Sequence, residues 1–254
     1  MTARYGRVYA GVYNRKWTGF AARAAPHIYD YVARVAPTGA LRTLLDVGCG
    51  TGQILRYFLD RGYHGIGLDL SPHMLQYAEE NCAPHVEAGT VVFLEADARS
   101  FRLEGQADAA IATFDMVNHL SDLEELDQLA SSVHRAVRPG GVFLFDLVTR
   151  QGMYRWNIVE VDDSEGSLII SRGVYDSSAD HAHYRVTGFV ERDDGLYERF
   201  DEVGQSTVFE LASVRCTLES AGWTGISFAR LEALDQPLDE PEAEKRVFVV
   251  ANRV

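Results

Sequence analysis

The chain has 254 residues, of which 46% are hydrophobic and 24% are charged, a composition that is typical of a folded globular protein and excludes a largely disordered one. It contains no run of the ~20 apolar residues that span a bilayer and no apolar N-terminal segment typical of a signal peptide, so we expect a cytoplasmic protein without a membrane partner. The net charge of −13 disfavours a nucleic-acid partner, because nucleic-acid binding depends on Lys and Arg side chains that neutralise phosphates.

Helical and strand patterns alternate over the first 150 residues. Apolar spacing predicts a helix over 18–35, and short apolar runs predict strands at 42–47, 65–70, 91–95, 109–114 and 142–148. One helix between these strands is predicted over 53–61, and a second begins after a cap formed by Ser71 and Pro72. A third begins at a Ser121–Glu124 capping box and runs to about Val137, and Pro139–Gly141 stops it.

After residue 150 strand patterns follow one another without helices. They cover 158–161, 168–175, 182–191 and 196–209, which predicts antiparallel hairpins. A helix over 210–221 and strands over 226–231 and 247–250 follow. Because parallel strands need helical crossovers, we expect a doubly wound α/β fold. Its seven-stranded, mainly parallel, Rossmann-like sheet would carry an antiparallel β insertion after the fifth strand.

Neither disulfides nor a metal site are expected. The three cysteines, Cys49, Cys82 and Cys216, lie far apart, and the eight histidines include one close pair, His181 and His183. Such spacing fits neither a disulfide framework nor a thiolate metal site.

A glycine-rich stretch, LLDVGCGTG at 44–52, joins the first strand of the alternating region to the next helix. Gly48, Gly50 and Gly52 allow a tight turn and a close approach of backbone to ligand. A dinucleotide-binding loop would have its third glycine at Gln53, and the lysine of a phosphate-binding Walker loop is absent. Asp46 would repel a phosphate and suits a cationic group such as an ammonium.

This acidic-x-Gly-x-Gly-x-Gly stretch resembles the first motif of the class I S-adenosylmethionine-dependent methyltransferases. More narrowly, the chain is similar to bacterial small-molecule methyltransferases that carry a β-rich lid. The resemblance is close over 44–148 and looser elsewhere. It implies a cofactor-binding domain over 1–150 and 207–254 with an N-terminal helical cap, and an inserted lid for the acceptor over 151–206.

The resemblance implies cofactor contacts at the ends of the second and third strands. Asp69 would accept hydrogen bonds from both ribose hydroxyls, with Leu70 beside it, and Met74 would pack near the adenine. Asp97 would accept from the adenine amino group and the Ala98 amide would meet a ring nitrogen. For Asp97 the alternative is an ordinary loop aspartate.

The segment from Phe114 to Leu120 follows the fourth strand, and the resemblance places it over the methionine part of the cofactor. Phe114 is therefore a predicted cofactor contact, and Asn118 and His119 are the predicted catalytic residues. Alternatively, Asn118 turns the chain and His119 packs. Tyr13, four residues after Tyr9, either covers the cofactor or belongs to the core.

We therefore predict methyl transfer from S-adenosylmethionine to nitrogen or oxygen of a small molecule, by a monomer or homodimer. A hydroxyl acceptor of high pKa would need a base such as His119. Two alternatives stay open at this point: a nucleotide-dependent oxidoreductase on a similar sheet, and a non-catalytic protein that binds the same cofactor.

Overall fold

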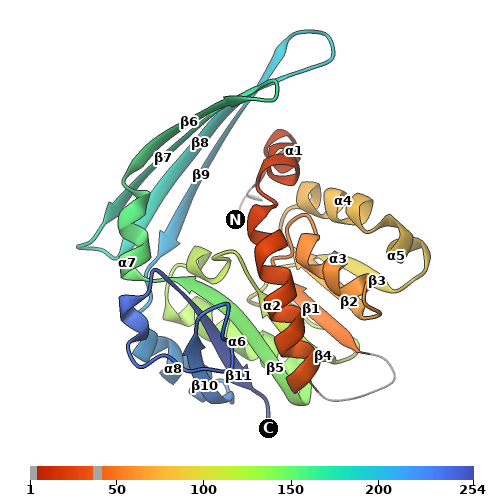
Figure 1. Cartoon of the computed structure of the whole chain (residues 1–254), viewed down its shortest axis with the longest axis vertical. Coiled ribbons are helices and arrows are strands. Elements are labelled where there is room, and N and C mark those ends of the chain that lie inside the picture. The colour runs from red at the N-terminus through yellow and green to blue at the C-terminus, as the bar shows by residue number, and fades with distance from the viewer. Residues whose placement is uncertain (1–4, 37–41) are drawn as a thin grey trace.

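The computed structural model describes residues 5–36 and 42–254; residues 1–4, part of the N-terminal segment considered above, lie outside them. A seven-stranded sheet in the order β10-β11-β5-β4-β1-β2-β3 forms the centre (Figure 1). Its strands are β1 (Thr43–Val47), β2 (His64–Asp69), β3 (Val91–Glu95), β4 (Ala107–Ala112), β5 (Val137–Val148), β10 (Thr224–Ala229) and β11 (Arg246–Asn252). The five strands from β1 to β5 pair in parallel, whereas β11 is antiparallel to both neighbours. The predicted fold class is confirmed.

Both faces of this sheet are buried, because alternate side chains of each strand enter different hydrophobic clusters. Leu45 packs on the face covered by α6 (Leu123–Ala136) and α8 (Leu211–Ser220). Leu44 packs on the face covered by α2 (Gly19–Val35) and α3 (Gln53–Leu59). Strands buried on both sides read as continuous apolar runs, which is why the sequence pattern was so clear here.

A second sheet extends away from this α/β layer (Figure 1). It contains β6 (Ile158–Ser164), β7 (Ser167–Asp176), β8 (His181–Glu191) and β9 (Tyr197–Thr207), all antiparallel. Helix α1 (Arg7–Lys16) packs against both β9 and α4 (Pro72–Asn81). The N-terminal helix therefore bridges the two sheets.

Shorter helical segments complete the fold. They are α5 (Ala83–Glu87), α7 (Arg150–Met153), η1 (Val117–His119), η2 (Tyr154–Trp156) and η3 (Pro241–Ala243). Across the two described ranges, no helix has both the length and the apolar character needed to cross a membrane.

Two local predictions were wrong. The cap of α6 is Asp122, whose carboxylate accepts from the Glu125 amide at 2.9 Å, so the capping pair starts one residue later than Ser121. The Pro139–Gly141 stretch does not precede the fifth strand but lies within it as a bulge, because β5 already begins at Val137. Pairing with β4 extends the strand across a proline that ordinarily ends one.

Candidate functional site

The loop between β1 and α3 has a backbone that suits glycine. Gly48, Gly50 and Gly52 have φ values of +69°, +53° and +76°, in the left-handed region that side chains disfavour. The Gly48 amide donates to Leu68 O at 2.8 Å, which ties the loop to β2. A Cβ on Gly48 would lie 2.5 Å from Met116 Cγ. The loop therefore presents backbone atoms to the space beyond β1.

Gly52 serves a different contact. A Cβ at this position would lie 3.1 Å from Ala78 Cβ in α4. Gly52 thus lets the start of α3 pack closely on α4, and its predicted contact with a cofactor stays a prediction.

Asp46 and Asp69 lie near the carboxyl ends of β1 and β2. Asp46 is 3% exposed, and burial together with the charge of Asp69 raises its pKa to about 7. Asp69 accepts from the amides of Gly50 at 3.0 Å and Ser71 at 2.9 Å. Burial raises the pKa of Asp69, and these amide donors oppose the rise. A cationic ligand group beside Asp46 would favour its ionised form.

Three hollows of about 510, 130 and 40 Å³ have Gly48 in their lining; we call them the large cavity, the middle hollow and the small hollow. The predicted cofactor residues divide among them. The middle hollow is lined by Asp69, Leu70, Asp97 and Ala98. The small hollow is lined by Tyr13, Asp46 and Phe114. The large cavity is lined by Tyr13, Gly50, Asp69, Met74 and Phe114. The large cavity continues to β7 and β8 of the second sheet.

Asp97 is held by an arginine two residues later. The backbone amide and Nε of Arg99 both donate to Asp97 Oδ1 at 2.9 Å, and Arg99 also pairs with Glu125. These bonds to Arg99 lower the pKa of Asp97, so its carboxylate is a fixed hydrogen-bond acceptor in the middle hollow.

Met74 lies elsewhere than its predicted role suggests. It is buried in a cluster with Tyr9, Ala10 and Val12 of α1 and lines the large cavity rather than the hollow that contains Asp97. Its predicted packing against the adenine stays a prediction.

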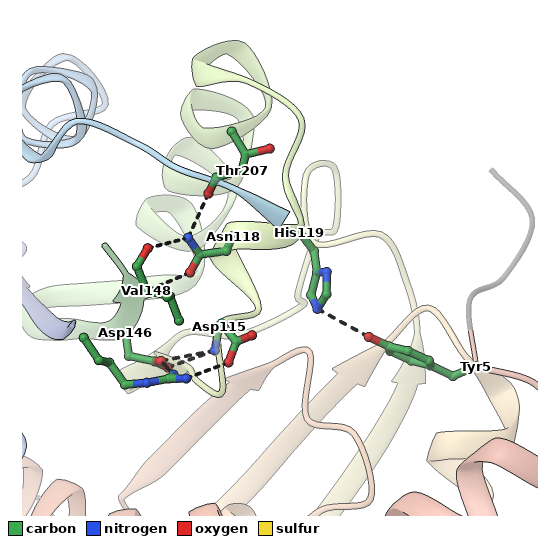
Figure 2. A network of polar contacts seen from close by, with 8 residues as sticks. Tyr5, Asp115, Asn118, His119, Asp146, Val148 and Thr207 are labelled. Atoms are coloured by element: carbon green, nitrogen blue, oxygen red, sulfur yellow. Dashed lines mark hydrogen bonds and ion pairs between the residues drawn. The ribbon is translucent and has the colours of Figure 1, made fainter. Parts of the chain in front are cut away.

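The chain after β4 turns through two residues with unusual backbone. Phe114 and Asp115 have φ of +63° and +54°, and such conformations at non-glycine residues cluster at functional sites. The Phe114 ring stacks on Phe20 at 4.8 Å. The Asp115 amide donates to Asp146 at 3.1 Å (Figure 2), and Arg246 pairs with both carboxylates.

Asp146 is the most deeply buried member of this group. Burial raises its pKa to about 6, although the charge of Arg246 opposes the rise. Asp115 and Arg246 line the large cavity, and sequence reasoning missed all three residues. The available signal was a charged residue inside the apolar strand pattern of β5, because buried charges are rarely left unpaired.

Asn118 is turned away from the cavity. Its side-chain nitrogen donates to Val148 O at 3.1 Å and to Thr207 O at 2.8 Å, and its oxygen accepts from the Val148 amide at 2.9 Å (Figure 2). The residue is 0% exposed. This geometry favours the alternative structural role, because the amide joins η1 to β5 and β9; the catalytic role of Asn118 stays a prediction.

His119 faces the cavity. Its Nδ1 lies 3.2 Å from Gln205 O and its Nε2 lies 3.3 Å from the hydroxyl of Tyr5 (Figure 2). Since a carbonyl can only accept, Nδ1 carries the proton of the neutral ring and Nε2 is the acceptor. His119 lines both the large cavity and the middle hollow, so its ring lies where the two meet, with Nε2 facing the Tyr5 hydroxyl.

Comparisons with known proteins agree on the family. The model of a methyltransferase domain matches residues 44–141. A protein of Geobacillus sp. (strain WCH70) named "Putative methyltransferase GWCH70_2453" is 30% identical over 219 residues, which cover 85% of each chain. The chain belongs to the class I S-adenosylmethionine-dependent methyltransferases.

Two further relatives of this methyltransferase have named acceptors. A Streptomyces venezuelae dTDP-3-amino-3,4,6-trideoxy-alpha-D-glucopyranose N,N-dimethyltransferase is 28% identical over 84% of this chain and 89% of its own. The solved structure of CalS10, an amino pentose methyltransferase from Micromonospora echinaspora with S-adenosylmethionine bound, is 25% identical, covers 98% of both chains and has a TM-score of 0.69. The predicted enzyme class and cofactor are confirmed.

The residues of the site fit this cofactor. A Cβ at Gly48 would intrude on Met116 beside the hollows, and the buried Asp46 carboxylate would be balanced by the ammonium of the methionine part. The roles of the individual residues stay predictions.

Proposed function

We propose that this methyltransferase methylates a nitrogen or oxygen atom of a small polar molecule, with amines and amino sugars as the first candidates. The observation that carries the proposal is the large cavity, which joins the glycine loop at Gly48 to Tyr184 of the second sheet and has His119 in its wall. The acceptors named for the S. venezuelae relative and for CalS10 support the choice of an amino group.

In this proposal the predicted cofactor residues act by binding and orienting. Asp46 neutralises the ammonium, Asp69 accepts from the ribose hydroxyls, and Asp97 with Ala98 receives the adenine. Tyr13 and Phe114, whose rings lie 6.1 Å apart, exclude water from the methionine part. When bound, the cofactor supplies a methyl group activated by a positively charged sulfur, so the protein's main task is alignment.

His119 would remove the proton that the acceptor loses. His119 lines the cavity and its Nε2 lies 3.3 Å from the Tyr5 hydroxyl. A proton from an acceptor hydroxyl or ammonium would therefore pass to the Tyr5 oxygen as Tyr5 gives its own proton to Nε2, or would reach Nε2 directly once that hydrogen bond is broken. Proton transfer of this kind contributes about 10²- to 10⁴-fold to rates. A neutral amine would need less help than a hydroxyl.

The lid is the proposed acceptor domain. We infer that residues 151–206 form it, while residues 1–150 and 207–254 form the cofactor domain. Support comes from the large cavity, to which Trp156 and Tyr184 contribute aromatic walls 5.3 Å apart between ring centroids. The net charge of −13 favours a small acceptor over a nucleic acid. We infer that the enzyme acts in the cytoplasm as a monomer or homodimer.

Methyl-labelled S-adenosylmethionine tests the proposal. The enzyme is incubated with it and with a panel of amines, amino sugars and phenols, and structured RNA is a negative control. We expect label on a small molecule, and loss of at least about 100-fold in His119→Ala for a hydroxyl acceptor. Calorimetry that detects no binding of the cofactor would refute the proposal, as would transfer only to RNA.

A further inference from the structure

Asp115, three residues after β4, is a buried carboxylate in the wall of the large cavity. Its Oδ1 accepts from Arg246 Nη2 at 2.9 Å. Within residues 5–36 and 42–254, no side chain or backbone amide donates a hydrogen bond to Oδ2. Figure 2 shows this second oxygen on the side of the carboxylate that faces away from Asp146. Asp115 therefore has one oxygen that can accept a hydrogen bond from a ligand in the cavity.

The negative charge of Asp115 is only partly balanced. The single guanidinium of Arg246 pairs with Asp115 and also with Asp146. Burial raises the pKa of Asp146 to about 6, so above this pH the group has two negative charges and one positive charge. Asp146 is 0% exposed, whereas Asp115 lines the cavity. The excess negative charge is therefore presented to the cavity by Asp115.

This charge acts on the part of the cavity that contains predicted cofactor contacts. Burial raises the pKa of Tyr13, and among the neighbouring carboxylates Asp115 raises it most, ahead of Asp69 and Asp46. Tyr13 lines both the large cavity and the small hollow, and its ring lies 6.1 Å from that of Phe114, the residue before Asp115. Asp115 is thus close to the place where the proposed cofactor contacts meet the acceptor space.

The local backbone holds Asp115 in this place against its own preference. Phe114 and Asp115 both have positive φ, at +63° and +54°, and two such residues in a row persist only where their surroundings hold them. The Asp115 amide donates to Asp146 at 3.1 Å, and the Phe114 ring stacks on Phe20. The structure therefore fixes the position of the Asp115 carboxylate before any ligand binds.

We propose that Asp115 contacts the reacting amino group of the acceptor, so that the atom methylated is nitrogen. The inference rests on the proposed function and narrows its acceptor class. In the transfer step the lone pair of a neutral amine forms the C–N bond, and the C–S bond of the cofactor breaks with its electron pair going to sulfur. Positive charge thereby passes from sulfur to nitrogen, and the N-methylammonium product gives its extra proton to solvent after release.

A fixed carboxylate beside the nitrogen stabilises the charge that develops there during transfer. A neutral amine gains this stabilisation only as it reacts, so Asp115 favours the transition state over the bound reactant. A phenolate acceptor would have its negative charge beside the same carboxylate and would be repelled. The charge of Asp115 therefore selects an amine over an ionised hydroxyl.

The first test uses binding alone and needs no acceptor. In Asp115→Asn the charge is removed, while the amide oxygen can still accept from Arg246. Asp201→Asn is the matched control, because Asp201 also pairs with arginines but lies on β9, outside the residues that line the cavity. The probes are sinefungin, a cofactor analogue with an ammonium group where the cofactor has its methylated sulfur, and S-adenosylhomocysteine, which has no charge there.

Calorimetry should show that Asp115→Asn weakens sinefungin binding at least about 10-fold and S-adenosylhomocysteine binding less than about threefold. Asp201→Asn should bind both probes as the wild type does. Equal weakening of both probes in Asp115→Asn would indicate a purely structural role and overturn the proposal, as would unchanged binding of both. Thermal unfolding of each variant identifies a loss of folding, in which case Asp115→Glu, which keeps the charge, should retain the preference for sinefungin.

The second test compares amines with phenols from the acceptor panel. We expect transfer to an amine, with kcat lowered about 10- to 100-fold in Asp115→Asn and unchanged within about twofold in Asp201→Asn. Transfer to phenols but not to amines would overturn this inference and leave the proposed function in place. Absence of transfer to any small molecule, with sinefungin binding weakened in Asp115→Asn, would support the role of the Asp115 charge and refute only the proposed function.

Discussion

Replacement of Asn118 by alanine should destabilise the protein rather than abolish chemistry. The change removes three hydrogen bonds of 2.8 to 3.1 Å and leaves the Val148 amide, the Val148 carbonyl and the Thr207 carbonyl without these partners. Val148 and Thr207 are buried, so water does not replace the hydrogen bonds of the lost side chain. At about 1–1.5 kcal/mol for each such bond, the expected loss is about 3–5 kcal/mol, a large part of the stability of an ordinary domain.

Urea unfolding followed by circular dichroism measures this loss. Asn252→Ala is the control, because Asn252 is exposed and its side-chain nitrogen donates to Gly225 O over a long 3.5 Å. This variant should lose less than about 0.5 kcal/mol. His119→Ala should also remain stable while losing turnover. An Asn118→Ala protein within about 0.5 kcal/mol of wild type but without methyl transfer would refute this reasoning and support the predicted catalytic role of Asn118.

Three further predictions concern the cofactor site. Asp69→Ala removes a carboxylate acceptor and should weaken S-adenosylmethionine binding about 10- to 100-fold by calorimetry. The pKa of Asp46 is near 4 in the unfolded chain but about 7 in the folded protein. Between these pH values the folded state binds more protons than the unfolded state, so the stability of the ligand-free enzyme should fall as the pH rises. Cofactor affinity should rise over the upper part of that range, and Asp46→Asn should weaken both trends in thermal-shift titrations. Gly48→Ala would place Cβ 2.5 Å from Met116 Cγ at a φ of +69° and should cost about 1–3 kcal/mol in urea unfolding.

The central sheet could be predicted because its signals are local. Strands buried on both faces and helices between them leave an apolar pattern that needs no knowledge of distant residues. The bulge at Pro139–Gly141 could not be predicted in the same way. It exists because Ala107 and Ala109 of β4 pair with Val137 and Val142 of β5. The local preference of proline to end a strand gives no information on that pairing between strands.

The residues of the site likewise differ in whether a local sequence signal predicts them. Gly48, Gly50 and Asp46 belong to one short motif, whose backbone requirements are visible in its residue types. The Tyr5 amide donates to Glu202, which is 197 positions away, and neither residue has a local signal. Their contact depends on how the second sheet sits against α1, which is a matter of tertiary packing.

The position of Arg246 shows why the last strand matters to the site. Its guanidinium pairs with Asp115 and with the fully buried Asp146, and it lies 5.2 Å from the centroid of the Phe20 ring. A buried ion pair of this kind is seldom favourable compared with apolar packing, so its presence calls for a role other than stability. The pair holds the strained turn at Phe114 and Asp115, which lines the cavity. The antiparallel strand β11 therefore contributes the cation that keeps this wall of the site in its left-handed conformation.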